Sequence, residues 1–354
     1  MAHALQLAER GLYSTSPNPR VGSVLVNDGT LLGAGWHERA GEPHAEVHAL
    51  REAGDRARGA TAYVTLEPCS HHGRTPPCAD ALIKAGVARV VVAMQDPNPL
   101  VAGQGLARLR AAGIEVDCGL MEGAARALNI GFLARMALGM PWVRSKIAAS
   151  LDGRTALNNG ASKWITGEAA RQDVQHWRAR SCAVLTGIGT VLADDPELNV
   201  RNIQVPRQPL RAVVDNGLRL PPAARLLRQP GVVVYTASSD AQKTAALEQA
   251  GAEVRVLPDA RGQVDLLTVL RDLAERGCNE VLVEAGNRLN GALLRAGLVD
   301  ELVLYLAPQL LGDMARGMAG LGELTGLEQR VNLEWDDVRH VGRDLRIVAR
   351  IEKD

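Results

Sequence analysis

The residues best suited to chemistry in this 354-residue sequence lie in its first quarter. His44 and Glu46 flank a single alanine, and Cys69 and Cys78 each follow a proline. Zinc takes imidazole nitrogen and thiolate ligands in a tetrahedron, and a catalytic zinc site keeps its fourth position for water. His44, Cys69 and Cys78 are therefore a candidate set of three zinc ligands. Cys78 is expected at the start of a helix, where the helix dipole favours its thiolate.

Glu46 is the candidate acid–base residue of this site. A carboxylate is an unusual fourth ligand beside two cysteines, but two residues past the histidine it is well placed to move protons. Zinc lowers the pKa of bound water to about 7. Glu46 can pass the water proton to a ring nitrogen, and a later, second proton transfer through the same carboxylate lets ammonia leave. The pattern H-x-E followed by P-C is typical of zinc-dependent deaminases. The eight residues between the two cysteines depart from that pattern, which has two.

Two hypotheses compete with this interpretation. A closed structural zinc site, in a module without catalysis, would use His71 or His72 as a fourth ligand, but it leaves Glu46 without a role. A zinc deaminase acting on a nucleoside or a tRNA base would keep the same three ligands. Lys+Arg and Asp+Glu number 40 each, and residues 1–140 carry 13 of each. Because nucleic-acid-binding domains usually carry a basic excess, the balance predicts a small-molecule substrate and no nucleic-acid partner.

Alternating strand and helix patterns predict two α/β domains, 1–140 and 141–354, joined at Gly139-Met140-Pro141. The five cysteines are scattered, and the sequence has no apolar run of about 20 residues, so it predicts a cytoplasmic protein with no membrane partner. The first domain should have strands over 21–28, 30–37, 61–68, 89–94 and 114–119, and helices over 43–54, 76–86, 104–113 and 122–138. The second should build a mostly parallel sheet from strands over 141–149, 182–187, 211–216, 232–237, 280–286 and 301–308.

The second domain shows weaker signals of its own. It has no G-x-G-x-x-G after its first strand, so the Rossmann fingerprint is absent. Gly187 and Gly189 follow one strand, and Gly286 follows another and opens a helix. Such turns let backbone N–H groups approach a pyrophosphate, although they also occur as plain helix caps. Lys146 and Glu284 are expected at strand ends, where a buried charge often marks a site.

Several longer stretches resemble one family. PNPRVG, GEPHAEVHAL, TLEPCSHHGRTPPC, SLDGRTA, WIT, VLADDPEL and VEAG, in this order, resemble the bifunctional riboflavin-biosynthesis deaminase–reductases over nearly the whole chain. The resemblance implies a cytidine deaminase-like N-terminal domain, a dihydrofolate reductase-like C-terminal domain and a homo-oligomer. It implies two reactions: zinc-dependent removal of the 2-amino group of 2,5-diamino-6-(5-phosphoribosylamino)pyrimidin-4(3H)-one, and NADPH-dependent reduction of the product's ribosyl group to ribityl.

The resemblance also implies site residues beyond the zinc ligands. Asn216 stands where the family pattern leads us to expect serine. Arg219 is a candidate partner of the NADPH 2′-phosphate. Three residues, Lys146, Asp194 and Glu284, are candidates for the general acid of the reduction, and the sequence does not rank them. The deaminase pocket would include Asn18, His37, His71 and Arg74. NADPH would meet Ala148, Trp164, Thr190, Asp194, Asn216, Gly286, Asn287, Arg288, Leu289, Asn290, Gly291 and Ala292. The reductase substrate would meet Lys146, Ser162, Arg178, Leu198, Arg201 and Glu284, with Arg178 and Arg201 as phosphate clamps.

Overall fold

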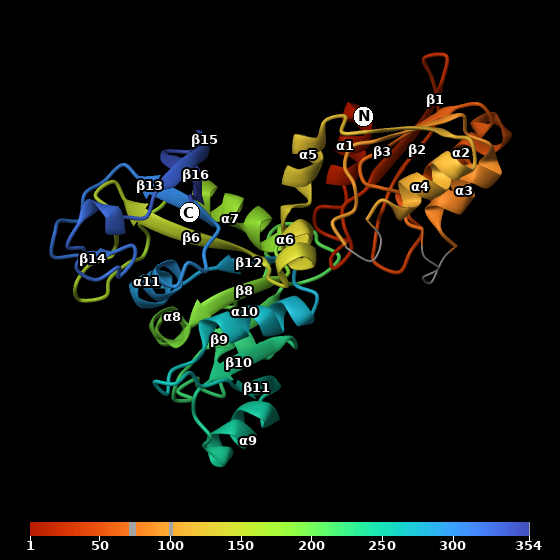
Figure 1. Ribbon diagram of the computed structural model, residues 1–354. Coiled ribbons are helices and arrows are strands. Elements are labelled where there is room, and N and C mark those ends of the chain that lie inside the picture. Colours follow the sequence, from red (N-terminus) through yellow and green to blue (C-terminus); the bar gives the residue numbers. More distant parts are fainter. Residues whose placement is uncertain (71–75, 99–101, 354) are drawn as a thin grey trace. The chain divides into compact units, whose positions relative to one another are not determined.

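The chain divides into two compact units, Met1–Gly139 (unit 1) and Met140–Asp354 (unit 2) (Figure 1). The computed structural model describes residues 1–70, 76–98 and 102–353. Each unit contains its own sheet and its own buried apolar clusters. That each unit carries one of the two expected activities stays a prediction.

Unit 1 is built on a sheet whose described strands follow the order β2-β1-β3-β4-β5. Asp28 and Gly29, both with positive φ, form the tight turn between β1 and β2. β1 is antiparallel to β2 and β3, whereas β3, β4 and β5 run parallel. The strands are β1 (Gly22–Asn27), β2 (Thr30–Trp36), β3 (Thr61–Val64), β4 (Arg89–Val92) and β5 (Glu115–Cys118), and the helices are α1 (Ala2–Glu9), α2 (Ala45–Ala53), α3 (Cys78–Ala85), α4 (Gln104–Ala111), α5 (Glu122–Leu128) and α6 (Ile130–Leu138), with a 3₁₀ turn at Gly54–Ala57.

Glycines on β2 set the position of α2, the helix that carries Glu46. A Cβ added at Gly33 would lie 2.2 Å from the Ala49 carbonyl oxygen, and one at Gly35 would lie 2.7 Å from the Ala45 carbonyl oxygen. Only glycine lets the helix backbone approach the strand this closely. The start of α2 is therefore held against the sheet.

The single helix predicted over 122–138 is in fact two helices, α5 and α6, interrupted at Asn129. The buried Asn129 side chain accepts a hydrogen bond from the Arg20 amide at 2.8 Å and donates one to the Arg20 carbonyl at 2.9 Å. An asparagine that pairs with backbone elsewhere competes with helical continuity. The partner is 109 residues away in sequence, so periodicity alone could not reveal the break.

Unit 2 confirms the expected mostly parallel sheet and extends it. Its described strands follow the order β11-β10-β9-β8-β12-β6-β13-β16-β15, parallel from β11 to β13 and antiparallel beyond. β11, β15 and β16 were not expected from the sequence. The strands are β6 (Trp142–Ser150), β8 (Ala183–Gly187), β9 (Leu210–Val214), β10 (Val232–Thr236), β11 (Ala252–Val256), β12 (Glu280–Val283), β13 (Glu301–Ala307), β15 (Leu333–Val341) and β16 (Asp344–Ile351), with the short pair β7 (Arg154–Ala156) and β14 (Arg316–Gly317) apart.

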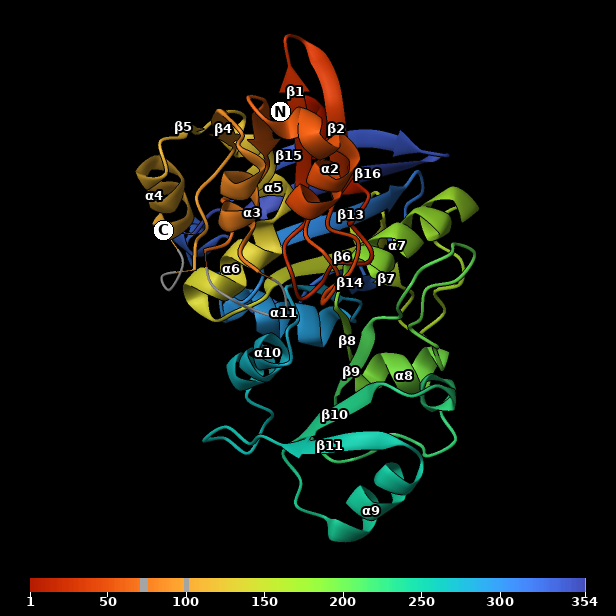
Figure 2. The same cartoon turned by 90° about the vertical axis from the view of Figure 1, so that its right-hand side faces the viewer.

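The helices of unit 2 follow the parallel strands, and α9 lies beside β11 at the sheet edge (Figure 2). They are α7 (Glu168–Arg180), α8 (Ile188–Asp194), α9 (Ala241–Gln249), α10 (Leu266–Glu275) and α11 (Asn287–Arg295), with 3₁₀ turns at Arg225–Arg228 and Leu327–Gln329. The carboxyl ends of β8, β9 and β12 open onto one cleft of about 2060 Å³. Ligands of open α/β sheets bind at this position. A single small-molecule pocket has roughly 300–1,000 Å³, so the cleft has room for two ligands.

Candidate active sites

The three predicted zinc ligands of unit 1 come together. His44 caps the N-terminus of α2, Cys78 is the first residue of α3, and Cys69 lies in the segment after β3. The His44 Nδ1 atom lies 3.6 Å from Cys69 Sγ and 3.3 Å from Cys78 Sγ. In a zinc tetrahedron with bonds of about 2.0 Å to nitrogen and 2.3 Å to sulfur, ligand atoms lie roughly 3.5 Å apart. The donor types and their spacing therefore fit zinc.

The two cysteines of this site differ in their protonation. Hydrogen bonds from the Cys78 side chain, together with those of His44 and the Cys78 backbone, lower the pKa of Cys69 to about 4. The Cys78 backbone N–H lies 3.3 Å from Cys69 Sγ. Cys69 is therefore the thiolate of the pair at neutral pH, the form that binds metal. The hydrogen bond with Cys69 and burial raise the pKa of Cys78, contrary to the thiolate expected at a helix start, so metal binding would release the Cys78 proton.

Glu46 lies in the first turn of α2 and is only 3% exposed. Burial, and then the Cys69 charge, raise the pKa of Glu46 to about 7, and a bound divalent cation would lower it again. Its side chain interacts with both Cys69 and Cys78. A carboxyl group at this position can accept and return a proton beside the ligand triad.

His37 and Asn18 lie beside the triad. The His37 ring is buried, and its centroid lies 5.2 Å from that of His44. Its Nδ1 lies 3.2 Å from the Pro43 carbonyl oxygen and its Nε2 lies 3.0 Å from Asn18 Nδ2. Burial lowers the pKa of His37, so the ring is neutral, with Nδ1–H donating to Pro43 and Nε2 accepting from Asn18. His71, His72 and Arg74 lie outside the described residues.

Glu67 is a structural residue next to the zinc triad that sequence reasoning missed. Its buried carboxylate accepts hydrogen bonds from the backbone amides of Asp96 (3.1 Å), Gly103 (3.0 Å), Gly105 (2.8 Å) and Leu106 (3.3 Å). A Cβ added at Gly105 would lie 2.1 Å from the Pro68 carbonyl oxygen, so α4 packs directly on the segment that leads to Cys69. In the sequence, the signal for this role is that Glu67 stands two positions before the zinc ligand Cys69.

Replacing Glu67 by alanine is expected to lower the free energy of unfolding of unit 1 by about 2–4 kcal/mol. The change leaves four buried amides without their acceptor, and each unsatisfied donor costs about 1–3 kcal/mol before water enters. Urea denaturation measures the loss, with zinc content as a second readout. Glu115→Ala, at an exposed position of β5, is the matched control. Equal stabilities of the two variants would contradict the role of Glu67 as the acceptor of these four amides.

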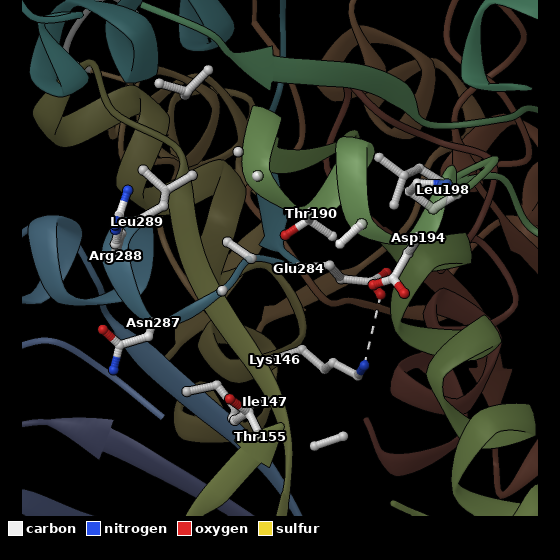
Figure 3. A pocket seen from close by; sticks show the side chains of 18 of the residues that line it. Lys146, Ile147, Thr155, Thr190, Asp194, Leu198, Glu284, Asn287, Arg288 and Leu289 are labelled. Carbon is white, nitrogen blue, oxygen red and sulfur yellow. Dashed lines mark ion pairs between the residues drawn. The ribbon is translucent and has the colours of Figure 1, made fainter. Parts of the chain in front are cut away.

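The cleft of unit 2 brings together most of the predicted reductase residues (Figure 3). Asn290 and Gly291 do not line it. Asn290 is bonded to Ser145 and to the carbonyls of Ala285 and Met318, and a Cβ at Gly291 would lie 2.2 Å from the Gly320 carbonyl oxygen. One face of α11 therefore packs on other segments, and the cofactor contacts of Asn290 and Gly291 stay predictions. The lining includes Lys146, Ala148, Ser162, Trp164, Arg178, Thr190, Asp194, Leu198, Arg201, Asn216, Glu284, Gly286, Asn287, Arg288, Leu289 and Ala292.

Glu284 stands at the centre of a buried charge cluster. Arg178 donates to it through Nε at 2.5 Å and Nη2 at 2.9 Å, and Lys146 Nζ lies 3.7 Å from its Oε2 (Figure 3). Burial alone would raise the pKa of Glu284, but Arg178 and Lys146 lower it to about 2. Burial also lowers the pKa of Lys146. Lys146 lies in the middle of β6, an interior strand, so its expected place at a strand end was wrong.

Two glycine turns lie side by side in the cleft, at the carboxyl ends of the neighbouring strands β8 and β12. Gly187 caps α8 and Gly286 caps α11. A Cβ at Gly187 would lie 3.5 Å from Leu289 Cδ2, and one at Gly286 would lie 3.9 Å from Thr190 Oγ1. A Cβ at Gly189 would meet nothing within 4 Å. This open backbone beside a helix N-terminus fits a dinucleotide pyrophosphate.

Other polar contacts define the ends of the cleft. Gln175, which sequence reasoning missed, accepts a hydrogen bond from the Arg201 amide at 2.9 Å, and the Arg171 guanidinium lies 4.7 Å from the Trp164 ring centre. Arg178 also donates to the Asn199 carbonyl at 2.9 Å, which leaves two of its five N–H groups for a phosphate. The sequence signal that could have identified Gln175 is helical spacing. Arg171, Gln175 and Arg178 are separated by four and three residues and therefore share one face of α7.

The fold and the two sites define an enzyme with a zinc-type hydrolytic centre in one unit and a dinucleotide-sized cleft in the other. Residues 1–94 match the cytidine and deoxycytidylate deaminase zinc-binding region, and residues 141–347 match the RibD C-terminal domain. The chain belongs to the RibD family, with a cytidine deaminase-like N-terminal domain and a dihydrofolate reductase-like C-terminal domain.

Individual relatives match over nearly the full length. Riboflavin biosynthesis protein RibD of Escherichia coli K12 is 52% identical, covering 98% of this chain and 96% of that protein. RibD of Acinetobacter baumannii has a similar structure, with 50% identity, a TM-score of 0.92 and coverage of 99% of this chain and 98% of that chain. A diaminohydroxyphosphoribosylaminopyrimidine deaminase/5-amino-6-(5-phosphoribosylamino)uracil reductase of Thermotoga maritima has 34% identity and a TM-score of 0.89, covering 99% and 97%.

Proposed function

We propose that the protein carries out two successive steps of riboflavin biosynthesis. Unit 1 deaminates 2,5-diamino-6-(5-phosphoribosylamino)pyrimidin-4(3H)-one to 5-amino-6-(5-phosphoribosylamino)uracil, and unit 2 reduces the ribosyl group of that product to ribityl with NADPH. The observation that carries the proposal is the histidine–cysteine–cysteine triad beside buried Glu46 in a chain that also holds the Lys146–Glu284 cleft. Zn²⁺ and NADPH are its cofactors, and the substrate is a small pyrimidine.

In unit 1, the residues of the chain hold the ion, orient the ring and move protons. When bound, zinc supplies a Lewis acid that makes water a nucleophile near neutral pH. Glu46 accepts one proton from the attacking water and delivers it to a ring nitrogen. It then takes a second proton from the new hydroxyl on the ring carbon and delivers it to the amino group, which departs as ammonia while the carbonyl forms. Asn18 donates to His37 through Nδ2, which leaves its Oδ1 to accept from a pyrimidine N–H. Arg74 stays a prediction as the partner of the substrate phosphate, and His71 as a pocket residue.

In unit 2, Lys146 is our candidate proton donor. When bound, NADPH supplies the hydride that adds to the anomeric carbon, and the bond from that carbon to the ring oxygen breaks as the oxygen takes a proton. Glu284, with its pKa near 2, stays ionised and cannot donate. Asp194 forms an ion pair with Lys163 at 3.1 Å. The lowered pKa of buried Lys146 makes its ammonium a better acid than an exposed lysine.

The remaining cleft residues divide between the two ligands. The amides of Asn287 and Arg288 at the start of α11 would bind the pyrophosphate, with Thr190 opposite. Ser162, Leu198 and Arg201 would contact the phosphoribosyl substrate. Trp164, Ala148 and Asp194 would lie along NADPH.

A sequential assay on the purified full chain tests the proposal. Ammonia should be released from the diaminopyrimidine, and NADPH oxidation should begin only after deaminated product accumulates. Metal analysis should find zinc. No ammonia from this substrate, with turnover of cytidine or adenosine instead, would contradict the proposal and favour the nucleoside or tRNA alternative.

Removal of zinc should separate the two activities. Treatment with a chelator is expected to lower ammonia release by at least about 10²-fold, because the site loses its Lewis acid. NADPH oxidation with the deaminated product as substrate should continue at its original rate, since the cleft of unit 2 contains no part of the triad. Re-addition of Zn²⁺ is the control for irreversible damage. Equal loss of both activities would contradict the assignment of zinc to unit 1.

We also propose that the protein is a cytoplasmic homo-oligomer. All five cysteines are free, which suits a reducing compartment. No helix in residues 1–70, 76–98 and 102–353 is long and apolar enough to cross a membrane. Edge strand β15 exposes Trp335 (61%) and Val338 (54%), which a second copy could cover. Analytical ultracentrifugation tests the oligomer; a monomer at micromolar concentration would contradict it.

A further inference from the structure

Most residues of the loop that follows α8, residues 195–202, line the cleft of unit 2. The Leu198 side chain of this loop lies in the same cleft as Lys146 and Glu284 (Figure 3). We build here on the proposed function, in which Arg201, near the end of the loop, contacts the phosphoribosyl substrate. The Arg201 side chain is 48% exposed, so a phosphate group can reach it. The side chains that hold its guanidinium are therefore candidates for controlling phosphate binding.

The backbone of this loop is fixed by contacts from other segments. Three of its residues have left-handed φ values of 41°, 53° and 64°: Asp195, Leu198 and Asn202. Such backbone is unfavourable for residues other than glycine and persists where surrounding contacts hold it. Gln175 accepts a hydrogen bond from the Arg201 amide at 2.9 Å, and Gln208 accepts one from the Val200 amide at 2.7 Å. These bonds fix the Arg201 backbone but leave its long side chain to be oriented by another group.

That group is Glu197, which lies between two arginines. Its Oε2 accepts from Arg201 Nη1 at 3.4 Å, and its Oε1 accepts from Arg225 Nη2. In the described part of the chain, the Arg201 guanidinium has no other hydrogen-bond or ion-pair partner. The hydrogen bond from Arg225 is the main cause that lowers the pKa of Glu197, so this carboxylate is ionised at neutral pH. Glu197 is therefore held chiefly by Arg225 and only loosely by Arg201.

Arg225 is itself anchored to the loop that it holds. It is the first residue of the 3₁₀ turn Arg225–Arg228, and its backbone amide donates to Asp195 Oδ1 at 2.9 Å. Both its main chain and its side chain thus contact residues of the loop. Without Arg225, the Glu197 carboxylate would lack its main counter-ion. It would then compete with a phosphate for Arg201 and repel the phosphate by its charge.

We propose that Arg225 is a positioning residue of the reductase site, which holds Glu197 so that Arg201 stays available to the substrate phosphate. In the free protein, Arg201 rests on Glu197 through one long contact that keeps its guanidinium in the cleft. When the substrate binds, Arg201 exchanges this contact for two parallel hydrogen bonds to the phosphate. Glu197 keeps its ion pair with Arg225 throughout, so no stronger contact has to break.

The test compares Arg225→Gln, Glu197→Gln and the double variant with the unaltered full chain. NADPH oxidation at saturating NADPH gives kcat and KM for 5-amino-6-(5-phosphoribosylamino)uracil and for the same compound without its phosphate. The matched control is Arg228→Gln, an exposed arginine of the same 3₁₀ turn that does not line the cleft.

We expect Arg225→Gln to raise KM for the phosphorylated substrate about tenfold, because the released carboxylate captures Arg201. The loss should appear in KM and not in kcat, since it weakens binding of the substrate and of the transition state equally. KM for the compound without phosphate should not change. The double variant should return KM for the phosphorylated substrate to within about twofold of the unaltered protein, because the competing charge is then gone.

This rescue separates positioning from other roles of Arg225. An equal rise of KM in Arg225→Gln and in the double variant would mean that Arg225 binds the phosphate itself or only supports the fold, and would overturn the inference. Unchanged KM in Arg225→Gln would overturn it as well. Failure of the proposed function looks different: the unaltered protein would then not oxidise NADPH with either compound, or would give the same KM for both.

Discussion

Glutamine in place of Glu46 is expected to lower the rate of ammonia release by about 10²–10⁴-fold, the usual contribution of a positioned acid–base group. Glutamine has nearly the same shape, so α2 and its cap at His44 should stay in place. The amide cannot accept the water proton or return it to the leaving nitrogen. Zinc content should not change, because the three ligand atoms belong to other residues.

The experiment compares Glu46→Gln with Glu9→Gln, an exposed glutamate of α1 in the same unit. Ammonia release, zinc content and NADPH oxidation on the deaminated product are measured for each. If Glu46→Gln loses zinc together with activity, Glu46 contributes to zinc binding. If the variant keeps full turnover, Glu46 is not the acid–base residue. Reductase activity should be the same in both variants.

Local sequence order was enough to predict the zinc triad, because the signal is carried by residue type and spacing: His44 and Cys78 stand at the starts of helices and Cys69 lies in the segment between β3 and α3. The hairpin at Asp28-Gly29 and the glycine caps Gly187 and Gly286 were visible for the same reason: their turn geometry depends on residue type at one position. These features also confirmed the expected α/β class in both units.

Features that depend on contacts between distant segments could not be predicted in the same way. Asn129 interrupts a helix because its partner is Arg20, and Glu67 matters because α4 presents its amides there. Lys146 looked like a strand-end residue, although β6 continues to Ser150 between β12 and β13. β15 carries exposed residues at most positions, so it lacks the clean alternation of a half-buried strand.

Lys146→Met is expected to lower NADPH oxidation by about 10²–10⁴-fold and to leave ammonia release unchanged. Methionine fills the space of the lysine stem and leaves the Arg178–Glu284 ion pair intact, so unit 2 should fold. Glu284→Gln is a less clean test, because it removes the partner of two buried cations and breaking a buried pair costs about 3–5 kcal/mol. Lys84→Met, at an exposed position, is the control for loss of a lysine.

The pH dependence separates proton donation from simple positioning. The pKa of Lys146 is lowered by burial, so the wild-type rate should fall as pH rises through that lowered value and the ammonium loses its proton. Glu284 has its pKa lowered to about 2 from an ordinary 4.5, so its contribution to stability is complete above about 4.5 and disappears only as pH falls through 2. Titration of Glu284 therefore causes no change in the rate of NADPH oxidation between pH 5 and 9. The residual activity of Lys146→Met should not fall at alkaline pH in this way, and its NADPH affinity should be unchanged. If the variant still shows the alkaline fall in rate, another group donates the proton.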